Sequence, residues 1–155
     1  MLQISAVMIA MALSQSPIAG RPELPVGAVV LPVSAASKLL HQCSRVTPAP
    51  GDGSWQPDGR TIYELEDALL TFLPDQKVRW RNQMFPKDYT RQYVGYIKNG
   101  HRMIYGNFVA VTGDQLHGLP VTEPLILCDG GSDACGVEYD VDARRVTHFA
   151  LNGAI

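Results

Sequence analysis

The 155-residue sequence has little net charge, only 3 cysteines and no apolar run long enough to cross a bilayer. Its formal charge at pH 7 is −2, which is too small to predict nucleic-acid or anionic-membrane binding from bulk electrostatics. The cysteines form no Cys-x-x-Cys pair, and no His-x-x-x-His spacing accompanies them. We therefore expect no metal site, no nucleic-acid partner and no stable membrane span.

Motifs for nucleophilic catalysis and for cofactor binding are also missing. The sequence contains no Gly-x-Ser-x-Gly, and its histidines are scattered, at His41, His101, His117 and His148. Gly130 and Gly131 follow a predicted strand but open no predicted helix, so no phosphate-binding loop and no cofactor are expected. A non-catalytic protein is the first hypothesis. The alternative is a small hydrolase that uses Cys135 or a His/Asp pair.

The length and the 46% apolar content predict one domain with a hydrophobic core. Residues 1–16 form an apolar run of the length of a signal-peptide core, with small residues near Ala12 and Ser14, and are predicted to be a signal peptide. Residues 17–33 hold four prolines and are predicted to be an extended linker with little structure. The predicted domain covers residues 34–155.

A β-hairpin is predicted around Asn99 and Gly100, because both positions of a type I′ turn need positive φ and two β-rich runs flank the pair. This turn fixes the register of the two strands. Lys98 then lies opposite His101, and the next pairs on the same face are Tyr96 with Met103 and Val94 with Tyr105.

The main helix is predicted at Thr61–Leu73, where Thr61-x-x-Glu64 is typical of a capping box and apolar residues recur every three or four positions. We predict an α+β fold in which this helix packs on an antiparallel sheet of about four strands. The strands are drawn from 92–98, 101–111, 124–128 and 136–151, with a turn near 140–144. The order of elements is similar to that of cystatin-like folds, by analogy only.

Three polar clusters have a plain interpretation that we prefer to a functional one. The acids at 64–67 complement the helix dipole, and Asp129, Ser132 and Asp133 favour a turn because the EF-hand spacing is absent. The basic and aromatic residues between Lys77 and Arg91 resemble a nucleic-acid-binding composition, but they also suit an ordinary solvated connection. Trp55 is predicted to cover the core rather than to stack on a ligand.

Several short motifs lie along the second half of the chain: RQYVG at 91–95, IYGNF at 104–108, CDGG at 128–131, GVEYD at 136–140 and NG at 152–153. Together with QCSR at 42–45, they resemble small exported proteins of Gram-negative bacteria, to our knowledge without an assigned activity, over roughly residues 34–153. The resemblance implies an exported location and no mechanism. Cys135 stands where the resemblance implies an aromatic residue.

Export would permit disulfides, and we predict one between Cys43 and Cys128, with Cys135 free. The prediction rests on compartment, spacing and the resemblance together. Closing a loop of roughly eighty residues would stabilise the fold by about 4 to 5 kcal/mol, against about 2 to 3 kcal/mol for the short loop between Cys128 and Cys135. Stability alone does not decide the connectivity, so the short link remains open.

The first functional hypothesis is an exported, non-catalytic module that binds another envelope protein, in the manner of an inhibitor or immunity protein. A passive structural envelope protein is a further alternative. Tyrosine and arginine are enriched at interface hot spots, and the hairpin carries five candidate contact residues: Arg91, Tyr93, Tyr96, Arg102 and Tyr105. The expected location is periplasmic or secreted. The sequence predicts no oligomeric state.

Overall fold

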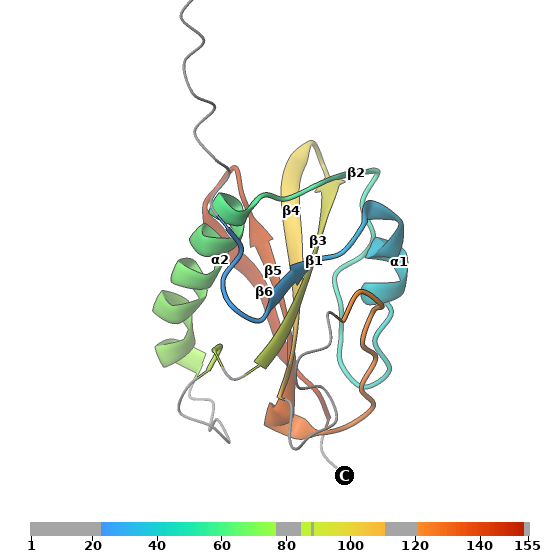
Figure 1. The fold of residues 1–155 in the computed structure, drawn as a ribbon, viewed down its shortest axis with the longest axis vertical. Helices are drawn as coiled ribbons and strands as arrows, with labels where there is room; N and C mark the ends of the chain where they lie inside the picture. The colour runs from blue at the N-terminus through green and yellow to red at the C-terminus, as the bar shows by residue number, and fades with distance from the viewer. Residues whose placement is uncertain (1–22, 77–84, 88, 111–120, 154–155) are drawn as a thin grey trace, which may run out of the picture.

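A computed structural model describes residues 23–76, 85–87, 89–110 and 121–153 (Figure 1). These residues form an α+β fold with a six-stranded mixed sheet and one main helix, which confirms the predicted fold class. The predicted signal peptide and most of the basic stretch after Lys77 lie outside the described residues. No helix within the described ranges has the length and apolarity that a membrane crossing requires.

The predicted hairpin forms the centre of the sheet. Strand β3 (Tyr89–Lys98) pairs antiparallel with β4 (His101–Ala110), and Lys98 lies opposite His101 as the turn requires. Asn99 and Gly100 have φ angles of 52° and 79°, so both occupy the left-handed region that a type I′ turn needs. The predicted register is confirmed throughout the hairpin.

The remaining strands extend the sheet on both sides of the hairpin. The strand order is β1-β3-β4-β5-β6, and β2 pairs with β3 beside β1; the strands are β1 (Ala28–Val30), β2 (Gly53–Trp55), β5 (Ala134–Asp140) and β6 (Arg145–Leu151). The pair β5 and β6 confirms the predicted turn near 140–144. Because β1 runs parallel to β3, the sheet is mixed rather than wholly antiparallel.

Three predicted segments differ from the structure. Part of the predicted linker 17–33 is β1, which completes the hydrogen bonding of the edge of β3. Residues 53–55, which lie outside every predicted strand, form β2, which pairs with Gly95–Ile97 on the same edge of β3. The predicted strand 124–128 is wrong, because these residues belong to no strand ladder.

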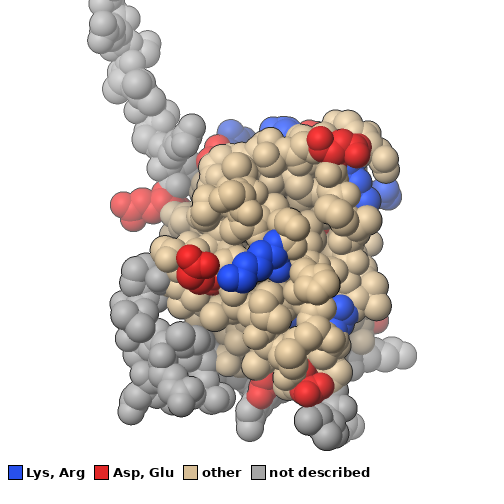
Figure 2. Space-filling model, turned by 90° about the vertical axis from the view of Figure 1, so that its right-hand side faces the viewer, with Lys and Arg blue, Asp and Glu red and all other residues tan. Residues whose placement is uncertain are grey.

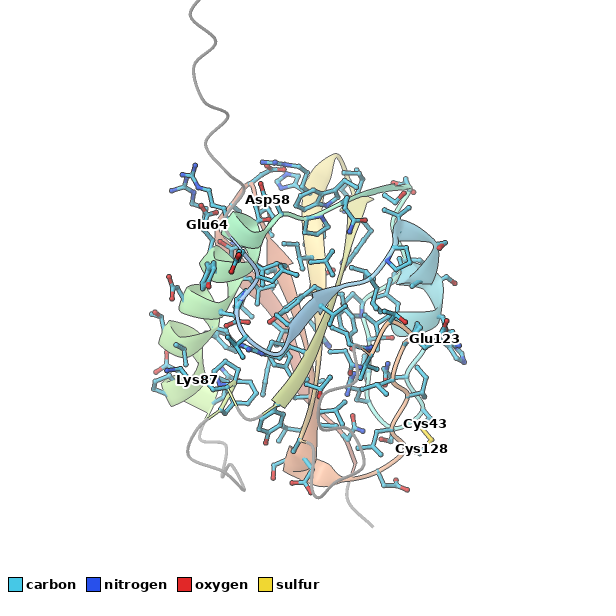
Figure 3. All side chains as sticks on the ribbon, in the orientation of Figure 1. Cys43, Asp58, Glu64, Lys87, Glu123 and Cys128 are labelled. Carbon is cyan, nitrogen blue, oxygen red and sulfur yellow. A yellow bond between two sulfur atoms is a disulfide. The ribbon has the colours of Figure 1, made fainter. Side chains whose placement is uncertain are left out.

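The main helix α2 spans Gly59–Phe72, two residues ahead of the predicted start. Asp58 is the N-cap: its Oδ1 accepts a hydrogen bond from the Thr61 amide at 3.0 Å, and the Thr61 hydroxyl accepts one from the Asp58 amide at 3.2 Å. Thr61 therefore closes the capping box as its fourth residue and does not open it. Figure 3 places Asp58 at this end of the helix.

Both faces of the sheet are covered (Figure 1). On one face, Ile62, Leu65 and Leu69 of α2 pack against Tyr93, Phe108 and Val137. On the other face lie the short helices η1 (Val33–Ala35) and α1 (Ala36–Leu39), where Leu31, Leu39 and Leu40 pack against Val94, Met103 and Tyr105. These two helices are only three and four residues long, and Ser34 lies within η1.

Candidate functional site

The contact residues predicted on the hairpin are mostly buried. Arg91 and Tyr96 are 2% exposed and Tyr93 and Tyr105 are 0% exposed, whereas the Arg102 side chain is 50% exposed. The predicted contact surface is therefore wrong for all but Arg102. The physical reason is that helices or loops cover both faces of the central hairpin, so its alternating aromatic residues form two cores.

Arg91 and Tyr93 instead belong to a buried ion pair beneath α2. The Arg91 guanidinium donates to both Glu66 carboxylate oxygens at 2.7 Å and also to the Val26 carbonyl, and the Tyr93 hydroxyl donates to Glu66 at 2.7 Å. Burial, reinforced by the neighbouring Glu66 charge, raises the pKa of Tyr93 well above its ordinary value. The cluster joins α2, β3 and the chain before β1, so its role is structural.

A small cavity of about 230 Å³ opens at the turn end of the hairpin. It is lined by residues of the central strands and of β6: Lys98, Asn99, His101, Met103, Glu138, Asp140 and Thr147. The buried Glu138 carboxylate accepts hydrogen bonds from Lys98 at 2.9 Å, from Thr147 at 2.7 Å and from the Tyr96 hydroxyl. Each carboxylate oxygen thus already has a donor.

The charge of Glu138 is stabilised in the folded protein. Desolvation by burial raises the pKa of this carboxyl, but the hydrogen bonds donated by Tyr96, Lys98 and Thr147 outweigh it, so the pKa lies below its ordinary value. The carboxyl of an unfolded glutamate has a pKa of about 4.3. The carboxylate therefore contributes stability above that pH, and the contribution disappears as the pH falls through the lower, folded-state pKa.

Glu138→Gln is expected to be less stable than the wild type at pH 7 and to lose this deficit in acid. The amide keeps one acceptor but cannot offer a charged oxygen to Lys98. Chemical denaturation of both proteins between pH 7 and pH 2.5 would measure the difference. A deficit that stayed constant across this range would contradict the assigned charge state.

His101 and Asp140 form a pair at the mouth of the cavity. His101 Nδ1 lies 3.0 Å from Asp140 Oδ2, and the His101 side chain is 53% exposed. A histidine oriented by a carboxylate can act as a general base, so the His/Asp pair of the hydrolase alternative does exist. Thr147 is the hydroxyl residue that shares the cavity, but its hydroxyl donates to Glu138.

The oxygens of Asp140 and Asp142 beside His101 could in principle hold a metal ion. The candidate ligand atoms of His101, Asp140 and Asp142 lie within 4.8 Å of one another. Both Asp142 carboxylate oxygens, however, accept hydrogen bonds from Arg102. Asp140 Oδ1 accepts hydrogen bonds from the backbone amides of Asp142 and Ala143. The Arg102 amide and guanidinium lower the pKa of Asp142. We interpret the cluster as an ion-paired turn and assign no metal to it.

The predicted disulfide between Cys43 and Cys128 is present, with the two Cα atoms 5.3 Å apart. Both residues are exposed, and Figure 3 shows the bond at the edge of the molecule. Cys135 is free and fully buried. Burial raises the pKa of its thiol to about 12, although the Arg45 charge acts in the opposite direction. Cys135 is therefore neither reactive nor accessible, and the hydrolase hypothesis based on it is wrong.

A wider groove of about 700 Å³ lies on the opposite side of the sheet from α2. It is lined by the turn of η1 and α1 and by the loop that follows the disulfide: Ser34, Ser37, Lys38, Leu40, His41, Thr47, Pro48, Ala49 and Pro50. Figure 2 views this side of the molecule and shows a mostly uncharged surface, with a basic group beside an acidic one near its centre. Val33, Val46 and Ile126, on segments that cover this side, are exposed. We call this surface the α1 face.

A buried polar network underneath the α1 face was not predicted from the sequence. The Arg45 guanidinium donates to the Tyr105 hydroxyl at 3.0 Å, to Asn152 Oδ1 at 2.6 Å and to Asn107 Oδ1. No carboxylate of the described residues hydrogen-bonds to it. The only sequence signal was the QCSR motif at 42–45, which indicated a resemblance but no role for Arg45.

Gly136→Ala is expected to destabilise the protein by about 1 to 3 kcal/mol through this network. A Cβ atom at Gly136 would lie 2.2 Å from the Tyr105 hydroxyl oxygen and 2.8 Å from Arg45 Nε. Gly53→Ala is the matched control, because its Cβ would meet Ile97 at 3.4 Å, an ordinary contact. Thermal and urea unfolding of both variants would test this. Equal stabilities for the two would contradict the tight packing at Gly136.

Comparison of the chain with protein-family models, with curated proteins and with solved structures finds no match. The function is therefore inferred from the geometry of the molecule itself.

Proposed function

We propose that this protein is an exported, non-catalytic module that binds another envelope protein through its α1 face. The observation that carries the proposal is a groove of about 700 Å³ on a mostly uncharged side of the molecule, together with the exposed Val33, Val46 and Ile126 on the neighbouring segments. Protein interfaces have cores that are depleted in charge and enriched in apolar groups. The α1 face has this character, whereas the hairpin end is dominated by ion pairs.

An extracytoplasmic location supports this proposal. The exposed Cys43–Cys128 disulfide is compatible with an oxidising compartment, and the resemblance to exported Gram-negative proteins implies the same location. The disulfide also fixes the loop that carries Val46 and the groove residues, so the α1 face is held in one conformation before binding. Preorganisation of this kind suits an inhibitor- or immunity-type binder.

The proposal is tested by affinity capture from an envelope extract of the producing organism, with the folded chain as bait. We expect one stoichiometric partner, and we expect Val46→Asp and Ile126→Asp to reduce its recovery at least tenfold. Tyr63→Asp and Leu70→Asp are matched controls, because both side chains are exposed on α2, away from the α1 face. Equal recovery with all four variants, or no partner at all, would overturn the proposal.

A hydrolase is the second candidate, because His101 and Asp140 lie 3.0 Å apart at the mouth of a cavity. In this function His101 would take a proton from an attacking water and Asp140 would orient the imidazole. A panel of nitrophenyl esters would measure the activity. Turnover that is lost in Asp140→Asn and kept in His148→Gln would favour the hydrolase, and absence of turnover in the wild type would remove it.

A further inference from the structure

Residues 121–129 lie beneath the α1 face as an irregular segment that belongs to no strand ladder; we call it the strap. Its hydrogen bonds to the sheet come from amide side chains. Gln92 Nε2 donates to the carbonyls of Val121 at 3.0 Å and Glu123 at 2.7 Å, and Asn107 Nδ2 donates to that of Leu125 at 3.0 Å. Asn152 Nδ2 donates to those of Leu127 at 2.6 Å and Asp129 at 2.7 Å.

The bonded carbonyls belong to every second residue of the strap, from Val121 to Asp129. The chain bends at Glu123 and at Asp129, whose φ is 67°, and at each bend one amide nitrogen bonds two carbonyls that lie two residues apart. The Leu125 amide also donates to Gln92 Oε1 at 2.8 Å. These contacts are all made to main-chain atoms of the strap, so they do not depend on its side chains.

Arg45 fixes the orientation of two of the side-chain amides that hold the strap. Arg45 has only donors, so the side-chain oxygens of Asn107 and Asn152 must face it, and their NH₂ groups must face the strap. Gln92 and Asn107 are 0% exposed, and Asn152 is 5% exposed. We call Gln92, Asn107 and Asn152, with Arg45 beneath them, the cradle. The cradle therefore presents a set of buried, oriented amide donors to main-chain carbonyls.

We infer that the cradle is a binding site for the main chain of a peptide, occupied in cis by the strap, and that the Cys43–Cys128 disulfide controls access to it. The occupant defines the ligand class: a peptide segment that is recognised by the main-chain carbonyls of every second residue. This site is distinct from the α1 face of the proposed function. The cradle is buried under the strap, whereas the α1 face is on the outer surface.

The disulfide is the covalent tie that holds the strap on the cradle. Cys128 lies within the strap, Cys43 lies in the loop that also carries Arg45, and both residues are exposed. A dithiol reductant transfers two electrons and two protons to the disulfide; the S–S bond breaks, two thiols form and the reductant becomes a disulfide. Without the tie, the strap is held by non-covalent contacts alone, namely its hydrogen bonds and the exposed ion pair between Glu123 and Lys38, and it exchanges with a free peptide.

Two measurements on the full folded chain, with and without dithiothreitol, test this inference. In hydrogen exchange followed by mass spectrometry, reduction is expected to speed exchange of the Leu125 amide at least tenfold, while the amides of β4 stay protected. The binding probe is a fluorescein-labelled peptide with the sequence of residues 121–129, in which serine replaces Cys128. It is expected to bind the reduced protein at least tenfold more tightly than the oxidised protein.

A matched probe isolates main-chain recognition. The same peptide carrying an N-methyl group at the position of Leu125 cannot donate to Gln92 and is expected to bind about tenfold more weakly. Equal affinity of the two peptides, equal affinity for oxidised and reduced protein, or an unchanged Leu125 exchange rate would overturn the inference. Loss of protection in β4 on reduction would also overturn it, because the disulfide would then hold the whole fold and not the strap.

Discussion

Replacing Cys43 and Cys128 together by serine is expected to lower the free energy of unfolding by about 4 to 5 kcal/mol. The disulfide joins residues 85 positions apart, so its loss releases a long loop in the unfolded chain and raises the entropy of that state. Because both cysteines are exposed, the serines bury no new polar group. Equilibrium denaturation in guanidinium chloride would measure the change.

The reduced wild type serves as the control for this prediction. It is expected to match the double serine variant, because both lack the same covalent link. Cys135 is free and buried, so it is not an alternative partner in the folded protein. A variant with the unfolding midpoint of the oxidised wild type would show that the link contributes nothing to stability.

Arg91→Met is expected to lower the free energy of unfolding by about 3 to 5 kcal/mol, because it leaves the Glu66 charge buried without its partner. The two side chains are 2% and 11% exposed, and the guanidinium donates to both carboxylate oxygens at 2.7 Å. Tyr93 remains as a donor to Glu66, but a neutral hydroxyl does not balance the charge. Urea denaturation at pH 7 would report the loss.

Two further variants separate the charge effect from a loss of packing. Adding Glu66→Gln to Arg91→Met removes the unpaired charge and is expected to recover a large part of the stability. Arg102→Met applies the same change to an exposed pair with Asp142 and is expected to have a much smaller effect, because solvent screens that pair. Similar losses for the two arginine variants, or no recovery in the double variant, would refute the assigned role of Arg91.

The hairpin and the main helix were predictable because local chemistry determines them. The Asn99-Gly100 pair selects one turn type, and that turn sets all ten residue pairs between β3 and β4. The spacing of Ile62, Leu65 and Leu69 marks the buried stripe of α2. The exact cap was missed because Asp58 and Thr61 both suit an N-cap, and only the fold decides between them.

The prediction of a contact surface on the hairpin was wrong because burial depends on elements that are distant in the sequence. A sequence shows that Tyr93 and Tyr96 lie on opposite faces of a strand, but not that α2 covers one face and α1 the other. The strand prediction for residues 124–128 was wrong for a related reason. Their apolar composition is typical of a strand, but the backbone groups of Leu125 bond to amide side chains of the sheet and not to a neighbouring strand. Arg45 gave no chemical signal because its partners are distant in sequence.

Site-specific photo-crosslinking in the producing organism tests most directly whether the α1 face, and not the hairpin, is the contact surface. A photoreactive amino acid would replace Ser37 in the groove or, in a second strain, Asn99 in the hairpin turn. The account predicts one discrete adduct with an envelope protein from Ser37 and none from Asn99. An adduct from Asn99 with none from Ser37 would contradict it.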